Sequence, residues 1–343
     1  MVRCYFCSGE AATKRCKDGS LVCKDCFLSS FEAEVHETIV SDKLLEKGDT
    51  IAIGVSGGKD STVLAYILKE LNEKYDYGVK LVLVAIDEGI KGYRDDSLKA
   101  VESNRKDYEL LLKILSYKDL FGWTMDEIVA KVGSKNNCTF CGVFRRQALE
   151  RGATIVGANK LATGHNADDV AETVLLNMLR GDIARLQRSS VSFSIPLPRI
   201  KPLKRSFEKE IVMYARYKKL TYFSTECVYA PNSYRAYVRD YVKELGRIRP
   251  QAILDIIYSG DNIALRKEVI LPAMNSCEKC GSPSSLKLCK ACLLILGLNS
   301  NDNTLGIRKK KKEWKDKVSD ATNSACSTLR CSCAGDEKIS EQF

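Results

Sequence analysis

The sequence has no long apolar run. Its longest apolar stretches, such as residues 291–296, are far shorter than the roughly 20 residues that a membrane-spanning helix needs. The first twenty residues also lack the apolar segment of a secretory signal, because charged residues such as Arg3, Glu10 and Lys14 interrupt them. We therefore expect a soluble protein of the cytosol.

A chain of this length has little need of disulfides. With 343 residues it buries enough surface to be stable without covalent cross-links. The cytosol keeps thiols reduced unless a metal binds them, so we interpret the 15 cysteines as metal ligands or reactive thiols. An extracellular, disulfide-bonded protein is the alternative.

The charge is unbalanced in favour of lysine and arginine. The chain has 54 Lys and Arg against 44 Asp and Glu, a formal net charge of +10. Such an excess favours a polyanionic partner such as nucleic acid, without identifying it. The alternative is that the charge serves solubility alone.

Composition divides the chain into five parts. Residues 1–30 form a short cysteine-rich module, and residues 31–185 alternate between apolar strand-like runs and helical patterns. Residues 186–271 are basic and partly helical, and we expect them to face the substrate. A second cysteine-rich module spans 272–300. The basic tail at 301–343, with a lysine run at 309–312, is predicted to be disordered.

The alternation in the second part predicts an α/β fold. Helical spacing is expected over 31–45 and 63–71. The fold is therefore predicted to be a doubly wound, Rossmann-like parallel sheet, flanked at both ends by zinc modules, with ligands beyond the carboxyl ends of the strands. The strands are expected at residues 50–55, 81–86, 154–156 and 160–163.

A glycine-rich loop, SGGKDS at 56–61, follows the first of these strands. Gly57 and Gly58 let backbone N–H groups approach phosphate oxygens, the next helix contributes its dipole, and Lys59 adds a positive charge. The spacing from Gly54 is one residue shorter than in G-x4-GK-[ST] loops, and Asp60 stands where Ser or Thr would bind magnesium. The loop thus predicts a phosphate site unlike that of kinases and GTPases. A turn without a ligand is the alternative.

Together with two further motifs, this loop carries a resemblance. SGGKDS, AIDEG at 85–89 and ATGHNADD at 162–169 resemble the PP-loop (N-type) ATP pyrophosphatase superfamily, whose members cleave ATP between the α- and β-phosphates to adenylate a substrate. The resemblance implies ATP and Mg²⁺ as ligands and catalytic roles for Lys59, Asp168 and Asp169. On the motif alone, the two acids could simply complement a helix dipole. The nucleotide contacts implied are Gly54, Val55, Ser56, Gly57, Gly58, Lys59, Asp60, Ser61, Ile86, Arg145 and Gly164.

Two sets of four cysteines, each made of two Cys-x2-Cys pairs, predict zinc. Four thiolates complete a tetrahedral site and leave no coordination position for chemistry, so both sites are expected to be structural. Such a site contributes on the order of 10 kcal/mol to folding its own segment. Cys16 is interpreted as a spare thiol. The ligands are Cys4, Cys7, Cys23 and Cys26 in the first set, and Cys277, Cys280, Cys289 and Cys292 in the second.

A third Cys-x2-Cys pair, Cys138 and Cys141, has no matching pair nearby. Cys227 is the only other cysteine of the central region. Three thiolates suit a [4Fe–4S] cluster with one iron open to an exogenous ligand, and we expect Cys141 and Cys227 to take part in the chemistry. A persulfide on either residue without a cluster, and three unrelated thiols, are the alternatives. Cys326, Cys331 and Cys333 in the tail are expected to be unligated.

The order of all these motifs over residues 3–312 is similar to that of the tRNA 2-thiouridine synthetases. The resemblance implies an ATP-dependent tRNA sulfurtransferase that adenylates the C2 oxygen of wobble uridine 34 and replaces it by sulfur. It implies as partners tRNA, a second subunit of a thiolation complex, and a ubiquitin-related modifier whose thiocarboxylate donates the sulfur. The alternatives are 2-thiolation of cytidine 32 and a non-catalytic, zinc-stabilised tRNA-binding subunit.

Two basic groups are candidates for tRNA contacts. The second recurs at helical spacing beside three tyrosines, and such a face could contact phosphates and stack on an unpaired base. The alternative, which we favour slightly, is that the tyrosines pack into a core and the cations face water. The groups are Arg199, Lys201, Lys204, Arg205 and Lys209, and then Arg235, Arg239 and Lys243 beside Tyr234, Tyr237 and Tyr241.

Overall fold

The computed structural model describes most of the chain. The predictions for the lysine run at 309–312 and for Cys326, Cys331 and Cys333 lie outside the described residues. In the part that is described, no helix is both long enough and apolar enough to cross a membrane. The described residues are 2–133, 136–183, 185–186, 197–225, 227–229, 234–263, 274–302 and 304–307.

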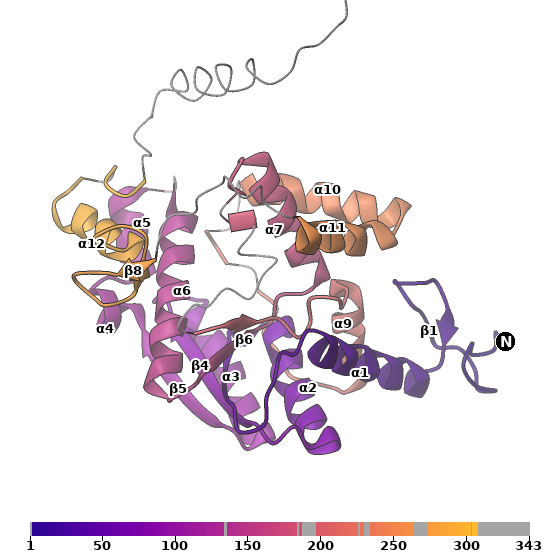
Figure 1. Cartoon of the computed structure of the whole chain (residues 1–343). Coiled ribbons are helices and arrows are strands. Elements are labelled where there is room, and N and C mark those ends of the chain that lie inside the picture. Colours follow the sequence, from indigo (N-terminus) through magenta and orange to yellow (C-terminus); the bar gives the residue numbers. More distant parts are fainter. Residues whose placement is uncertain are drawn as a thin grey trace, which may run out of the picture.

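The centre of the molecule is a parallel sheet of five strands in the order β5-β4-β3-β6-β7 (Figure 1). Every neighbouring pair is parallel, and helices connect most of the strands, so the predicted doubly wound α/β fold is confirmed. The strands are β3 (Thr50–Val55), β4 (Lys80–Asp87), β5 (Leu111–Ser116), β6 (Lys160–Thr163) and β7 (Arg199–Ile200).

The predicted strand at 154–156 is wrong. These residues end helix α6 (Asn137–Ile155), with Val156 as its C-cap. The helix approaches the sheet so closely at Gly152 that a β-carbon there would lie 2.5 Å from Val84 Cγ1. Packing of one helix face against the sheet has therefore overridden the local β preference of Thr-Ile-Val.

Helices cover both faces of the sheet. Ile51, Ile53 and Val55 of β3 point to one face and Ala52 to the other, as the period of two requires. The first face packs against α1 (Lys24–Ser41), α2 (Lys59–Tyr75), α3 (Arg94–Tyr108) and α9 (Glu208–Tyr217). The second packs against α4 (Tyr117–Phe121), α5 (Met125–Val132), α6 and α12 (Lys290–Asn299).

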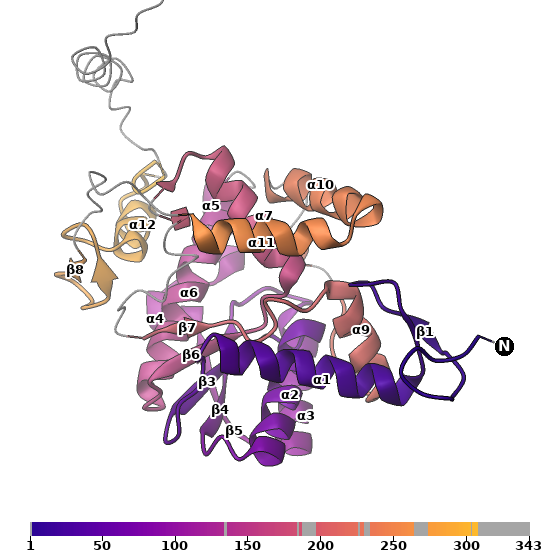
Figure 2. The same cartoon turned by 45° about the vertical axis from the view of Figure 1, so that its right-hand side comes forward.

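A third group of helices lies beyond the carboxyl end of β6. Helix α7 (Ala167–Leu179) begins shortly after β6 ends, and α10 (Tyr234–Ile248) and α11 (Gln251–Asn262) pack against it (Figure 2). Their shared core includes Val170, Val238, Val242, Ile253 and Ile257. This group stands on the side of the sheet where an α/β fold binds its ligands.

The two cysteine-rich modules lie at opposite sides of the molecule (Figure 1). The first contains β1 (Thr13–Lys14) and β2 (Leu21–Val22), the second β8 (Asn275–Ser276) and β9 (Pro283–Ser284). The first module leads directly into α1, which begins at Lys24 rather than at the predicted Phe31, because the thiol of Cys23 accepts a bond from Cys26 N and caps the helix. The predicted domain boundaries stay predictions.

Candidate functional site

The glycine loop joins β3 to α2 in a conformation that exposes backbone donors. Gly57 has φ +71°, and a β-carbon there would lie 2.6 Å from Ser97 O, so only glycine fits. Gly58 is the N-cap of α2, and because it has no side chain it makes no capping bond to the N–H groups of the first turn. Ser61 Oγ braces the loop by accepting from Ser56 N at 3.1 Å and donating to Gly58 O at 3.0 Å. The first turn of α2 therefore offers its N–H groups to an anion.

Lys59 and Asp60 stand together at this helix start. Lys59 Nζ lies 3.1 Å from Asp60 Oδ2 and 2.8 Å from Glu208 Oε1 on α9. Burial disfavours the charged lysine, but its bond to Glu208 and its contact with Asp60 raise the pKa of Lys59. Burial raises the pKa of the Asp60 carboxyl, although Lys59 and Asn166 oppose the shift. The ammonium is thus held charged at the position where phosphate would bind.

The segment 164–169 lies directly against this loop. A β-carbon at Gly164 would lie 2.9 Å from Asp60 C and 3.0 Å from Ser61 N, and Asn166 Nδ2 donates to Asp60 Oδ1 at 3.1 Å. The same Asn166 caps α7 by accepting from Asp169 N. Two motifs about a hundred residues apart in the sequence therefore meet at the carboxyl ends of neighbouring strands β3 and β6.

The two predicted catalytic acids have different partners. Asp168 Oδ2 accepts from Glu208 N at 2.8 Å, and burial raises the pKa of Asp168. Asp169 Oδ1 lies 3.0 Å from Arg235 Nη2 of α10. His165 has an exposed edge, its Nδ1 lies 2.9 Å from Thr163 Oγ1, and desolvation of the ring lowers the pKa of His165 to about 4. Arg235 is a site residue that we had assigned only to tRNA contacts.

Two acids at the end of β4 were missed from the sequence. Ile86 is buried as the second-last residue of β4. Asp87 ends the strand, and Glu88 follows it. Asp87 Oδ2 pairs with Arg94 Nη2 and Glu88 Oε1 with Arg145 Nη2, both at 2.7 Å. The motif AIDEG contained the signal, since polar residues that end a buried strand face the ligand side of the sheet.

The segment that carries Cys227 lies against the helix that carries Cys138 and Cys141, although it is distant in sequence. Cys138 is exposed at the start of α6, and its Sγ lies 3.9 Å from the carbonyl of Tyr229, two residues after Cys227. Cys141 and Cys227 both pack against one hydrophobic cluster. Tyr117 Oη donates to Cys141 O at 3.0 Å and fixes this turn of the helix. The segment that carries Cys227 therefore lies beside the first turn of α6, as a shared site for the three thiols requires.

Their surroundings fit a [4Fe–4S] cluster. Among the described residues, only the two predicted zinc sets are groups of three or more possible ligands whose atoms all lie within 4.8 Å of one another, so the three central thiols are spaced more widely. A wider spacing suits a cluster in which each thiolate binds a different iron. Burial raises the pKa of Cys141 and Arg145 opposes the shift, so a guanidinium faces this thiol. Within the described structure Arg145 Nε is buried without a partner, a donor available to an anionic group.

A chain of contacts connects these thiols to the glycine loop. Phe223 N donates to Gly57 O at 2.7 Å, and the Phe223 ring packs edge-on against Tyr93 at 5.2 Å between centroids. Burial raises the pKa of Tyr93, and Glu88 and the thiols of Cys227 and Cys141 contribute to the shift. Phe223 and Tyr93 thus connect the phosphate loop to the neighbourhood of the Cys141 and Cys227 thiols.

The two outer cysteine sets have the geometry of zinc sites. The four sulfur atoms of each set lie within 4.8 Å of one another. In the second set, Cys289 N donates to Cys277 Sγ at 3.2 Å and Cys292 N to Cys289 Sγ at 3.5 Å, the backbone bonds that stabilise thiolates. Gln147 Nε2 of α6 donates to Cys280 Sγ and Cys289 Sγ at 3.4 Å each. The second module is therefore fixed to the helix that carries Cys138 and Cys141.

Replacing Cys280 by serine is expected to reduce the zinc content from two ions per chain to one. Loss of one thiolate opens the tetrahedral site and removes most of the metal's contribution to the local fold. Elemental analysis of the purified protein measures this directly. The matched control is Cys16→Ser, because Cys16 lies outside both sets and should keep two ions. Two zinc ions per chain in the Cys280 variant would contradict the assignment of the second cysteine set as a zinc site.

The basic residues behave differently from the interpretation that we favoured. Tyr234, Tyr237 and Tyr241 are exposed, and Arg235 and Arg239 pair with Glu172 at 2.6 and 3.1 Å while their side chains stay partly exposed. The expectation that the tyrosines pack into a core is therefore wrong, whereas Arg239 and Lys243 face water as expected. Most of the other basic group is also paired: Arg199 with Glu150, Lys204 with Asp42 and Asp261, and Arg205 with Asp42.

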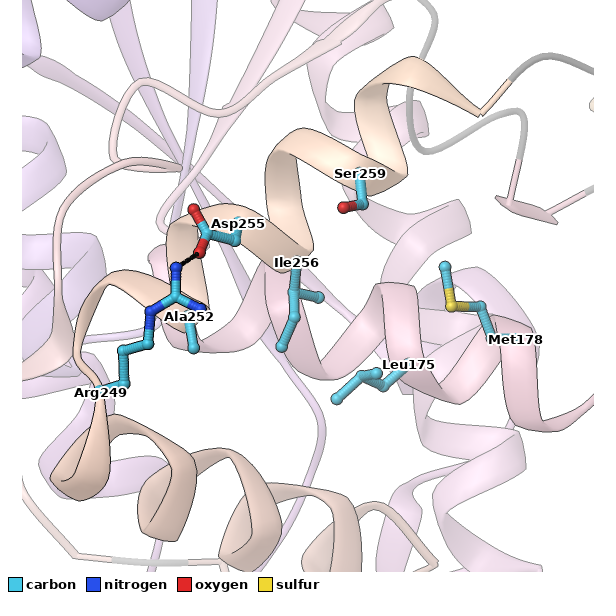
Figure 3. A pocket seen from close by; sticks show the side chains of 7 residues that line it. All are labelled: Leu175, Met178, Arg249, Ala252, Asp255, Ile256 and Ser259. Atoms are coloured by element: carbon cyan, nitrogen blue, oxygen red, sulfur yellow. Dashed lines mark hydrogen bonds and ion pairs between the residues drawn. The ribbon is translucent and has the colours of Figure 1, made fainter.

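A separate groove of about 330 Å³ lies between α7 and α11 (Figure 3). Arg249 and Asp255 form an ion pair at one end of it, and Met178 stands at the other. None of the predicted site residues lines it. Its lining consists of Leu175, Met178, Arg249, Ala252, Asp255, Ile256 and Ser259.

Fold and site together define a PP-loop protein with an appended zinc ribbon. Residues 28–245 match the family model of the PP-loop domain, and residues 275–306 match that of a zinc-ribbon. The sheet order and the loop between β3 and α2 are the structural counterparts of the first match. The superfamily resemblance seen in the sequence is confirmed.

The chain belongs to the family of cytoplasmic tRNA 2-thiolation protein 1. It is 61% identical over 312 residues to the protein of that name from Caenorhabditis elegans, covering 90% of this chain and 84% of the relative. It is 58% identical over 310 residues to the one from Drosophila melanogaster, covering 89% and 90%. The U34-tRNA thiolase NcsA from Methanococcus maripaludis, solved with its [4Fe–4S] cluster, is similar with a TM-score of 0.75, 33% identity and coverage of 91% and 99%.

Proposed function

We propose that this protein is an ATP-dependent tRNA sulfurtransferase that makes 2-thiouridine at wobble position 34. The observation that supports the proposal is the set of contacts through Phe223 and Tyr93 that joins the glycine loop of a PP-loop fold to the neighbourhood of Cys141 and Cys227. Similarity to tRNA 2-thiolation proteins and to a U34-tRNA thiolase supports tRNA as the substrate and uridine 34 as the modified position.

ATP solves a chemical difficulty in this reaction. The oxygen on C2 of a neutral pyrimidine is a poor leaving group, and adenylation turns it into part of AMP. Residues 54–61 bind the triphosphate through backbone N–H groups, and Lys59 stabilises charge that develops at the α-phosphate. Asp168 and Asp169 are the proposed ligands of Mg²⁺. Asp169 must then exchange its bond to Arg235 for one to the metal.

The central cysteines serve the second half of the reaction. A [4Fe–4S] cluster held by Cys138, Cys141 and Cys227 supplies an open coordination position for sulfide when it is bound. Arg145 is positioned by Glu88 and faces Cys141, so it balances negative charge at this site. The rival is a persulfide without a cluster, carried by Cys141 or Cys227, loaded by a donor of sulfane sulfur, and discharged when the other of these two thiols closes a disulfide with it. Both versions place the sulfur beside the activated base.

The protein acts, on this proposal, in the cytoplasm and within a larger system. The names of its relatives support the location. A second subunit of a thiolation complex, and a ubiquitin-related modifier whose C-terminal thiocarboxylate provides sulfur, are proposed from the resemblance of the motifs alone.

The function is tested with protein reconstituted anaerobically with iron and sulfide, then incubated with ATP, sulfide and unmodified tRNA. Nucleoside mass spectrometry should find 2-thiouridine at position 34, and AMP and pyrophosphate should accumulate with it. Thiolation at cytidine 32 would assign the related reaction instead. Release of ADP, or tRNA binding without any thiolation, would contradict the proposal.

Replacing Gly164 by alanine is expected to weaken ATP binding by about ten- to a hundredfold. The new methyl group would lie 2.9 Å from the backbone of Asp60, so the phosphate loop has to move. Isothermal titration with a non-hydrolysable ATP analogue measures the effect. Gly142→Ala is the control, because a β-carbon at Gly142 has no heavy atom within 4 Å. Equal affinities of the two variants would show that the loop is not the nucleotide site.

A further inference from the structure

Helix α10 carries an aromatic stripe on its surface. Tyr234, Tyr237 and Tyr241 are 52%, 73% and 59% exposed. Their spacing of three and four residues places them on one face of the helix. Large side chains exposed side by side are unusual on a soluble protein and mark an interaction surface.

The stripe is not needed to hold the helix in place. Val238 and Val242 are buried against α7 and α11. On the adjoining flank Arg235 Nε bonds Glu172 at 2.6 Å, and Arg239 Nε bonds the same carboxylate at 3.1 Å. The fixed position of α10 therefore comes from the valines and arginines, and the tyrosine rings are left for contact with another molecule.

A cation lies against the first of these rings. The guanidinium of Arg180 lies 5.6 Å from the centre of the Tyr234 ring, and Lys243 is exposed on the same helix. Aromatic faces beside cations, on a chain of net charge +10, form the type of surface on which unpaired bases stack.

The stripe also begins at the proposed catalytic site. Arg235, next to Tyr234, binds Asp169 at 3.0 Å. A uridine whose C2 is modified has to leave the stack of its loop to reach the nucleotide, and its neighbours then lose a stacking partner. A row of rings that leads away from Asp169 can replace the lost stacking.

We propose that Tyr234, Tyr237 and Tyr241 form a stacking surface for unpaired bases of the tRNA anticodon loop. The inference rests on the proposed function. It names the surface that binds the tRNA bases adjacent to the uridine that reacts. It assigns this role to the aromatic rings and not to the tyrosine hydroxyls. It therefore predicts that phenylalanine can replace tyrosine at these positions.

The test measures the affinity of the full-length, reconstituted protein for unmodified tRNA and for its isolated anticodon stem-loop by fluorescence anisotropy. The double variant Tyr237→Ala, Tyr241→Ala is expected to bind both RNAs about tenfold more weakly or worse, from the loss of one or two stacked bases. The double phenylalanine variant should bind within about twofold of wild type. Tyr258→Ala is the control, a residue 72% exposed on α11 and outside the stripe.

The possible results separate this inference from the function itself. Wild-type protein that thiolates tRNA, with unchanged affinity in the double alanine variant, would overturn the stacking surface and leave the function standing. Failure of the wild type to bind tRNA would overturn both. Unchanged tRNA affinity combined with a change of oligomeric state would assign the stripe to contacts between protein chains. Equal losses in the alanine and phenylalanine variants would also contradict a stacking role.

Discussion

Replacement of Cys227 by alanine should lower tRNA thiolation at least about a thousandfold while ATP binding stays close to that of the wild type. Cys227 is one of three thiols on the sulfur side of the site, whereas the phosphate loop is built from β3 and α2. The measurement is 2-thiouridine by mass spectrometry under single-turnover conditions, with affinity for an ATP analogue in parallel. Cys16→Ala serves as the control.

Cys138→Ala separates the two versions of the sulfur chemistry. A [4Fe–4S] cluster needs all three thiolates, so this variant should lose iron and activity together. A persulfide on Cys141 or Cys227 does not need Cys138, which is exposed at the edge of the group. Full activity of the Cys227 variant would remove that residue from the mechanism, and an active, iron-free Cys138 variant would favour the persulfide.

Replacing Lys59 by methionine is expected to slow ATP cleavage by a factor of about 10² to 10³. The substitution removes the charge that Glu208 and Asp60 hold at the start of α2 and keeps most of the aliphatic packing. Pyrophosphate release in the presence of tRNA measures the effect. The matched control on the same helix is Lys69→Met, because Lys69 has only a long pair with Glu73 at 3.9 Å.

Equal rates of pyrophosphate release by the Lys59 and Lys69 variants would contradict the assignment of the glycine loop as the ATP site. A further variant, Glu208→Gln, reports on the competition for Lys59. Because the carboxylate of Glu208 holds the ammonium before any phosphate arrives, its neutralisation should change the rate far less than the loss of Lys59.

Local sequence patterns were sufficient for the centre of the fold. The buried runs at 50–55 and 81–86 became β3 and β4, since a strand covered on both faces must be continuously apolar. The edge strand β5 was not predicted. Leu111 and Ile114 on it are exposed and Lys113 interrupts it, so its composition differs from that of a buried strand.

The predictions that local sequence patterns could not decide depend on contacts between distant segments. The pairing of Arg235 and Arg239 with Glu172 exists only because α10 packs on α7, and helical spacing alone does not say which side of α10 faces inward. The convergence of Cys227 with Cys138 and Cys141 was proposed from ligand counting and stays a prediction, which the contact between Cys138 Sγ and the carbonyl of Tyr229 supports. Asp87 and Glu88, by contrast, could have been predicted as site residues from their position at the end of a buried strand.

The central claim is that ATP activates the oxygen that sulfur replaces. The most direct measurement uses tRNA labelled with ¹⁸O at C2 of uridine 34 in a single turnover with ATP and sulfide. If the C2 oxygen is adenylated, the AMP released should carry the label in its phosphate, in a ratio of one labelled AMP to one 2-thiouridine. Unlabelled AMP, or thiolation without cleavage of ATP to AMP, would contradict the account.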